Sequence, residues 1–81
     1  MNNRFLVLIE KGDSSYGAYS PDVPGCIAIG HTEEATLELM KEALQGHLEL
    51  MAQDGDPMPM ASHIAAHFVE IDTPATVTTH S

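Results

Sequence analysis

The residues of this sequence that could do chemistry are a single cysteine, five histidines and twelve carboxylates. Cys26 follows Pro24 and Gly25, and a Cys–His nucleophile pair is conceivable there. The same cysteine begins an apolar stretch, however, and a buried, inert cysteine is the commoner arrangement in such a place. We therefore expect Cys26 to pack in a core rather than to react.

Metal binding is the second chemistry to consider. His63 and His67 are four residues apart, which is a ligand spacing on a helix. Their segment has the pattern of a connector and a strand, in which that spacing separates two residues by about 13 Å. One cysteine and dispersed histidines make no known zinc pattern. We expect neither a metal site nor a cofactor.

The carboxylates also form no recognisable catalytic set. Most of those in the expected helix lie on its outward face, spaced as on a solvated surface. No basic groove accompanies them to hold RNA, which disfavours a two-metal nuclease. The sequence has no phosphate-binding glycine loop and no G-x-S-x-G elbow. We predict that the protein is not an enzyme.

Length and charge restrict the function further. The chain has 81 residues, enough for one domain with a thin core that gains from association. Its net charge of −9 disfavours direct binding to nucleic acid or to an anionic membrane. It suits a basic protein partner, although solubility alone explains much of an acidic surface.

A lone cysteine fits a reducing cytosol, and the apolar run near the N-terminus is too short for a signal peptide or a membrane span. We expect a cytoplasmic protein.

Three strands are predicted in the first part of the chain. Residues 5–9 form a continuous apolar run, typical of a strand buried on both faces. A Gly-Asp-Ser-Ser turn leads to a second strand at 16–20. Residues 21–25 (Pro-Asp-Val-Pro-Gly) should be a rigid loop, and Gly25 permits a backbone angle that other residues avoid. A third strand follows at 26–29.

A helix is predicted over residues 33–53. Thr32 is a good N-cap, and Glu33 and Glu34 place negative charge in the first turn. Gly55 and the proline after it should end the helix. The main apolar stripe has spacings of three and four residues and comprises Leu37, Met40, Leu44, Leu48 and Met51.

A last strand is predicted over residues 65–71. The order is then βββαβ, an α+β fold with a mixed four-stranded sheet and one helix on one face. If the last strand lies beside the first, the two are parallel and the crossover is right-handed. We place one domain at 1–72 and a flexible tail at 73–81.

One helix can cover only one face of this sheet. In the first strand Phe5, Val7 and Ile9 point to one side, and Leu6 and Leu8 point to the other. A large exposed apolar patch usually marks an interaction site. We therefore expect a second subunit, or a partner, to cover the face that carries Leu6 and Leu8.

The sequence resembles the N-terminal domain of HicB-type antitoxins. The most specific part is a Pro-Asp-Val-Pro-Gly-Cys stretch followed by a strand and then Gly-x-Thr-x-Glu-Ala. The resemblance covers about residues 4–71, and its segments are 5–10 (Phe-Leu-Val-Leu-Ile-Glu), 16–19 (Tyr-Gly-Ala-Tyr), 21–26 (Pro-Asp-Val-Pro-Gly-Cys) and 30–35 (Gly-His-Thr-Glu-Glu-Ala).

The resemblance implies a partial RNase H-like fold without that fold's catalytic carboxylates. It also implies an antitoxin of a type II toxin–antitoxin system, which binds and inhibits a small, basic, HicA-like mRNA endonuclease. Members of the family add a C-terminal DNA-binding domain, whereas residues 73–81 here have no basic or helical signal. We therefore expect no operator binding by this chain alone.

Two alternatives to the toxin-binding role remain open. One is an orphan homo-oligomeric module of the same fold that binds another protein or a small molecule. The other is an RNase H-related nuclease.

Partner contacts are hard to choose from sequence. Asp22 is a candidate because it is polar and lies on a presented loop. Glu33, Glu34 and Glu38 are candidate acidic contacts, although a solvated face also explains them. The residues of the motif should mainly serve structure instead, and these are Pro21, Asp22, Pro24, Gly25, Cys26 and Thr32.

Overall fold

The computed structural model describes residues 4–74. Three strands and one helix follow one another in the order β1 (Leu8–Lys11), β2 (Tyr16–Tyr19), β3 (Ile27–Gly30) and α1 (Glu33–Gln53). The first four predicted elements are therefore present, in the predicted order. The first strand is displaced, however, because it was predicted at 5–9 and runs from Leu8 to Lys11, and it lies at an edge of the described sheet and is not buried on both faces. The α+β class is confirmed.

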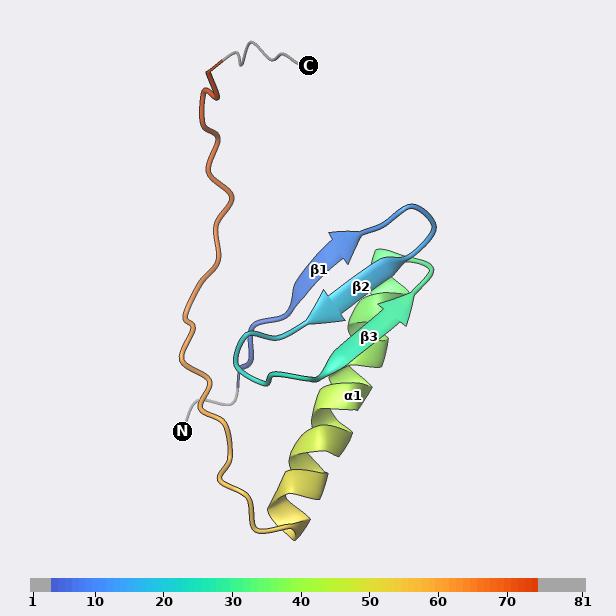
Figure 1. Cartoon of the computed structure of the whole chain (residues 1–81), viewed down its shortest axis with the longest axis vertical. Coiled ribbons are helices and arrows are strands. Elements are labelled where there is room, and N and C mark those ends of the chain that lie inside the picture. Colours follow the sequence, from blue (N-terminus) through green and yellow to red (C-terminus); the bar gives the residue numbers. More distant parts are fainter. Residues whose placement is uncertain (1–3, 75–81) are drawn as a thin grey trace, which may run out of the picture.

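The strands form an antiparallel meander in which β2 lies between β1 and β3 (Figure 1). Leu8 pairs with Tyr19, which in turn pairs with Ile27. Ile9, Ala18 and Ala28 form the neighbouring row. Because side chains alternate between the faces of a strand, these two rows point to opposite sides of the sheet.

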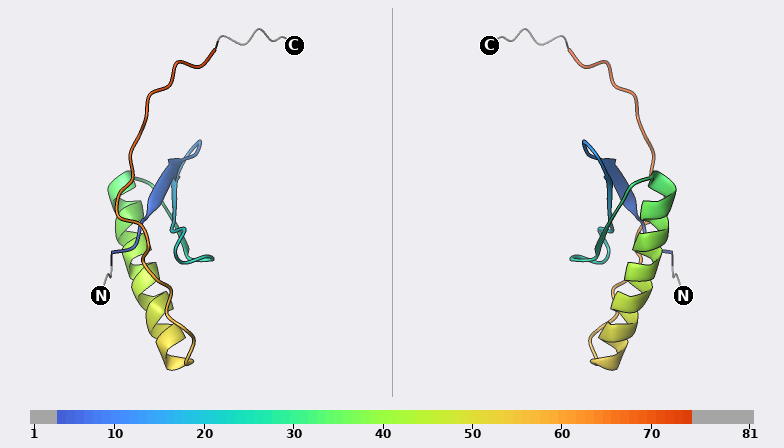
Figure 2. Two further views of the ribbon diagram at one scale, coloured as in Figure 1. Left: turned by 90° about the vertical axis from the view of Figure 1, so that its left-hand side faces the viewer. Right: turned by 90° about the vertical axis from the view of Figure 1, so that its right-hand side faces the viewer.

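The molecule has two layers, with α1 lying across one face of the sheet (Figure 2). The row of Ile9, Ala18 and Ala28 faces the helix, and Ala18 is 2% exposed. The core between the layers is small. Its buried members are Ala18, Val23, Cys26, Met40 and Leu44, and Phe5, Val7, Ile9, Ala28 and Ala43 pack against them.

Both ends of α1 have the predicted caps. The Thr32 hydroxyl accepts a hydrogen bond from the backbone N–H of Ala35 at 3.0 Å. At the other end Gly55 has a φ of 75°, and the N–H of Asp56 donates to the Met51 carbonyl at 2.9 Å. This six-to-one bond beyond a left-handed glycine is a Schellman motif, which satisfies carbonyls that the helix leaves unpaired.

The buried stripe of α1 follows the prediction except in the first turn, where Thr36 takes the place of Leu37. Thr36, Met40 and Leu44 are buried, whereas Leu37 is 47% exposed. The cause is the close approach of α1 to β3. A Cβ on Gly30 would lie 2.6 Å from Thr36 Oγ1, so the helix sits against the glycine with Thr36, not Leu37, at the contact.

The expectation of a mixed four-stranded sheet is corrected for the described residues, where the sheet has three antiparallel strands. Residues 57–74 form neither helix nor strand and run as extended chain past β1 (Figure 1). A hollow lies between residues 6–9 and residues 66–68, so their backbones do not form a ladder. The predicted tail falls largely on residues 75–81, outside the described part.

Candidate functional site

The face of the sheet that α1 leaves uncovered is the main candidate for protein binding. We call it the open face and define it by Leu8, Tyr19, Ile27 and Ile29. Ile27 and Ile29 are 64% and 65% exposed, and Tyr19 is 39% exposed. Three adjacent strands thus present apolar side chains on one side, which is typical of an interaction surface.

The predicted division of residues 5–9 between two sides agrees in part with this arrangement, although only Leu8 and Ile9 of these residues lie in β1. Phe5, Val7 and Ile9 pack against the core. Leu6 and Leu8 are half-buried and do not belong to the core cluster. Their role as an oligomer face stays a prediction, because it needs a second chain.

Sequence reasoning missed the larger part of the open face, which is contributed by Tyr19, Ile27 and Ile29. A signal was present in the third strand. Ile27 and Ile29 flank Ala28, and the small residue is the one that fits beneath the helix while the two large ones face outward. The alternation was readable, but only the position of the helix decides which set is buried.

The acidic residues proposed as partner contacts do not join the open face. Glu33, Glu34 and Glu38 are exposed in the first part of α1, which covers the opposite side of the sheet. The open side carries an acidic residue of its own, because Glu10 pairs with Gly17 and Gly17 pairs with Ile29. The structure therefore separates an acidic helix surface from an apolar sheet surface.

The loop between β2 and β3 serves mainly to hold the structure together. Gly25 has a φ of 87°, in the left-handed region where glycine is favoured. The N–H of Val23 donates to the Ser20 carbonyl, and the N–H of Cys26 donates to the Val23 carbonyl. These turns direct Val23 into the core, where it is 2% exposed, a placement that the sequence did not indicate. Pro21 and Pro24 remain exposed on the loop.

Cys26 is 4% exposed, and burial raises the pKa of its thiol. A thiol that is both covered and hard to ionise is a poor nucleophile. The side chain contributes to the core, as the strand pattern predicted.

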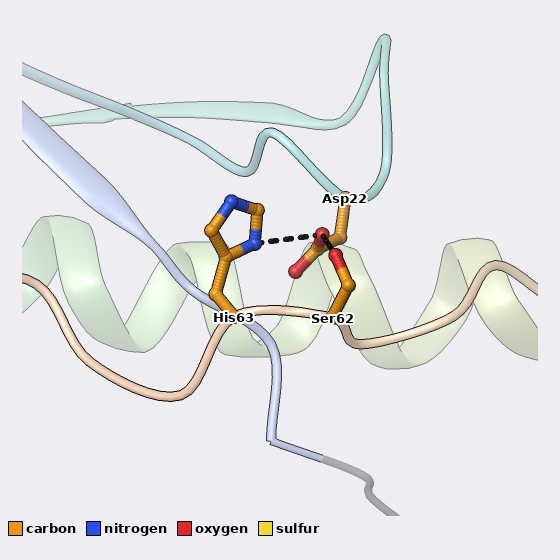
Figure 3. A network of polar contacts seen from close by, with 3 residues as sticks. All are labelled: Asp22, Ser62 and His63. Atoms are coloured by element: carbon orange, nitrogen blue, oxygen red, sulfur yellow. Dashed lines mark hydrogen bonds and ion pairs between the residues drawn. The ribbon is translucent and has the colours of Figure 1, made fainter.

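Asp22 occupies a different environment from the one expected of a presented loop residue. Its side chain is only 4% exposed. One carboxylate oxygen, Oδ1, accepts hydrogen bonds from Ser62 Oγ at 3.3 Å and His63 Nδ1 at 2.9 Å (Figure 3). Within residues 4–74 the other oxygen, Oδ2, is buried without a hydrogen-bond partner. Asp22 thus joins the β2–β3 loop to the C-terminal segment.

The pKa of Asp22 reflects opposing effects. Burial raises it, but the hydrogen bond from His63, the charge of that ring when protonated and the hydrogen bond from Ser62 lower it, and the Leu6 N–H adds to the lowering. The net result is a pKa below the usual range of an aspartate. The carboxylate is therefore held in its charged form.

The described part of the chain has no arrangement that points to metal chemistry. No group of three or more His, Cys, Asp or Glu side chains within residues 4–74 is placed to hold a metal ion. Among the same residues, no helix is both long and apolar enough to cross a membrane.

Comparison with known proteins identifies the family. The sequence profile of the HicB-like antitoxins of bacterial toxin–antitoxin systems matches residues 5–79. The chain belongs to this family. The HicB-like match spans all four elements described above and extends through the C-terminal segment.

A relative of this HicB-like chain is found in Haemophilus phage HP1 (strain HP1c1), where it is an uncharacterized 14.9 kDa protein in the rep-hol intergenic region. The two are 36% identical over 60 residues, which is 74% of this chain and 45% of the phage protein. The chain thus spans less than half the length of that relative. No solved structure shows significant similarity, so the relation to RNase H-like folds stays a prediction.

Proposed function

We propose that this HicB-like chain is the protein-binding module of an antitoxin, which inhibits a small, basic, HicA-like mRNA endonuclease in the cytoplasm. The observation that carries the proposal is the family match over nearly the whole chain. The open face and the acidic charge are the physical features that support it.

The two surfaces have different parts in the proposed complex. The open face supplies apolar area, which gives most of the favourable free energy of association. The acidic surface of α1 attracts a basic protein and raises the rate of encounter, but exposed charges add little affinity. A basic ribonuclease that neutralises the −9 charge fits both features.

Inhibition requires no chemistry from the antitoxin itself. A partner that binds RNA presents basic residues around its catalytic groups. A chain that carries acidic and apolar surfaces can cover those groups and exclude the substrate. The proposed role therefore asks for binding surfaces in this chain and for no catalytic group of its own.

Co-expression is the direct test of the antitoxin role. Induction of a HicA-like endonuclease should arrest growth, and co-expression of this chain should restore growth and yield a complex on a sizing column. Pull-down from native lysate should recover a small basic nuclease. Arrest that persists when the chain is present, with no complex formed, would refute the proposal.

The open face also supports a second candidate function, an oligomeric module without a toxin partner. Burial of the open face between two copies would cover the same apolar residues. Light scattering of the isolated chain distinguishes the two. A stable dimer that fails to bind the endonuclease favours the second candidate, and a monomer at micromolar concentration argues against it.

A further inference from the structure

The outer surface of α1 carries an apolar line of residues that remains exposed. We call it the seam and define it by Leu39, Ala43, Gly46 and Leu50. Leu39 is 43% exposed, Leu50 is 57% exposed, and Gly46 is exposed as well. Spacings of four, three and four residues keep these positions on one narrow face of a helix, as in the contact line of a coiled coil. The seam therefore has the pattern that another helix recognises.

The seam lies on the side of α1 that faces away from β1. Thr36 of the helix approaches Gly30 of β3, whereas Lys41 lines a hollow with Phe5, which precedes β1. Because successive residues of a helix are about 100° apart, the seam lies beyond Thr36, on the β3 side. Residues 57–74 run past β1 instead (Figure 1), so they leave the seam accessible to a partner.

Gly46 is the residue of the seam that packing within the single chain does not explain. Glycine in a helix interior costs about 1 kcal/mol relative to alanine. A Cβ at Gly46 would have nothing within 4 Å, so no neighbour among the described residues needs the space. The hollow over this glycine is lined by Glu38, Lys41, Glu42, Gln45 and Glu49. With the small Ala43 beside it, this hollow lets a second backbone approach α1 closely.

Carboxylates border the seam on its solvent side. Glu42 and Glu49 immediately precede Ala43 and Leu50, at positions that form ion pairs between the helices of a coiled coil. Both carboxylates are exposed, and within residues 4–74 neither is paired with a Lys or Arg. A helix with Lys or Arg along the facing border would supply the complementary charges. The border therefore specifies the charge of the occupant.

A second copy of this chain is a poor occupant of the seam. The Lys and Arg content of α1 is one residue, Lys41, and its side chain lines the hollow beside Phe5 on the other side of the helix. In an antiparallel pair of α1 helices, Glu42 of one copy would approach Glu49 of the other. The net charge of −9 on each chain adds to this repulsion. Charge therefore favours a basic helix from another protein.

We propose that the seam is a docking site for an amphipathic helix of another protein, whose apolar stripe is bordered by Lys or Arg. Leu39 and Leu50 contact the apolar stripe, Gly46 admits the backbone, and the carboxylates of Glu42 and Glu49 pair with the basic border. The inference goes beyond the proposed function, because the seam lies in the helix layer and the open face lies on the far side of the sheet (Figure 2). A bound helix can therefore coexist with an endonuclease on the open face.

Two synthetic helical peptides test the charge preference. Both have about three heptads with leucine and alanine along one stripe, which is bordered by lysine in the first and by glutamate in the second. Fluorescence anisotropy with the full chain should show about tenfold tighter binding of the lysine peptide. Glu42→Gln with Glu49→Gln should remove most of this preference and of its salt dependence. Glu33→Gln with Glu34→Gln is the matched control, because it changes the net charge equally but away from the seam. Equal affinity for the two peptides, or no binding of the lysine peptide, would overturn the proposal.

Gly46→Leu tests the place of docking. The new side chain fills the hollow and favours the helix, so resistance to urea should be kept or raised while affinity for the lysine peptide falls about tenfold. Ala52→Leu, at an exposed position of α1 away from the seam, is the matched control and should bind as the parent does. Unchanged affinity of Gly46→Leu would overturn the assignment of the seam. A dimer of the parent chain in sedimentation analysis that Gly46→Leu abolishes would overturn the choice of another protein's helix over a second copy.

Discussion

At the scale of single residues, Asp22 shows how a turn motif can conceal a contact. This aspartate lies in the stretch Pro-Asp-Val-Pro-Gly, and such a run of two prolines and a glycine predicts an exposed loop. Its side chain is instead covered by residues forty and forty-one positions later, Ser62 and His63. A carboxylate with such partners stabilises the fold only while it is charged.

This environment predicts a specific dependence of stability on pH. The pKa of Asp22 is lowered in the folded chain. Its contribution is therefore fully present above the pKa of an unfolded aspartate, about 3.9, and is lost as the pH falls through the lower pKa of the folded state. Asp22→Asn should reduce the free energy of unfolding at pH 7 and weaken its decline in acid.

Urea denaturation at pH 7 and at several values between about 5 and 2 checks this prediction. Asp13→Asn, in the exposed turn between β1 and β2, is the matched control and should leave the pH profile close to that of the parent. A parental profile for Asp22→Asn would show that the carboxylate is not coupled to folding.

Gly30 gives a second prediction at this scale. A Cβ at this position would meet Thr36 Oγ1 at 2.6 Å and the Thr36 backbone N at 3.1 Å. The Thr36 side chain could rotate away from a new methyl group, but the Thr36 backbone could not. Gly30→Ala should therefore lower the free energy of unfolding by about 1–3 kcal/mol. Gly17→Ala is the control, because nothing lies within 4 Å of a Cβ there. Chemical denaturation of both variants would show whether α1 depends on this close approach.

At the scale of elements, α1 was the part best predicted from sequence. The predicted bounds, 33–53, are those observed, because each end has local chemistry that specifies it. Thr32 supplies the N-cap, and Gly55 supplies the left-handed residue of the C-terminal motif. Signals of this kind act over a few residues and need no knowledge of the rest of the fold.

The glycines of this region allow a paired prediction. Gly46 lies in the helix interior, and a Cβ added there would have nothing within 4 Å, so Gly46→Ala should stabilise the chain by about 1 kcal/mol. Gly55 is equally open but has a φ of 75°, so Gly55→Ala should destabilise it. Thermal and urea unfolding of the two variants should shift in opposite directions. A loss of stability for Gly46→Ala would contradict the open surroundings of that residue.

The parts that sequence did not predict depend on contacts between distant segments. Met40 and Leu44 of the predicted stripe on α1 are buried, but Thr36 takes the place of Leu37 in the first turn because Thr36 lies against Gly30. The outward position of Ile27 and Ile29 depends on which face α1 covers. Residues 65–71 have the composition of a strand, but a strand needs a paired neighbour, and composition does not provide one.

At the scale of the whole molecule, the two layers leave an asymmetric surface. One side presents the acidic outer surface of α1, and the other presents the open face. A thin core of five buried apolar residues among those described gives the single chain limited stability of its own. Association through the open face would then contribute to folding as well as to function.

This asymmetry predicts where substitutions disrupt partner binding. Ile27→Asp with Ile29→Asp should abolish co-purification with the endonuclease, because charged groups cannot be buried there without a partner. Leu50→Asp, at a residue of α1 that is 57% exposed, is the matched control and should leave binding intact. Sizing chromatography of each variant with the endonuclease provides the measurement. Retained binding by the double variant would assign the interface to another surface.

The unpaired edge of β1 also affects how readily the chain aggregates. Bare strand edges act as templates on which other polypeptides can grow into fibrils. Here the template is short, and Glu10 and Lys11 close its far end with charge. A chain cut before residue 64 would keep the bare edge and lose the residues nearest to it, so shortened forms should be the first to precipitate.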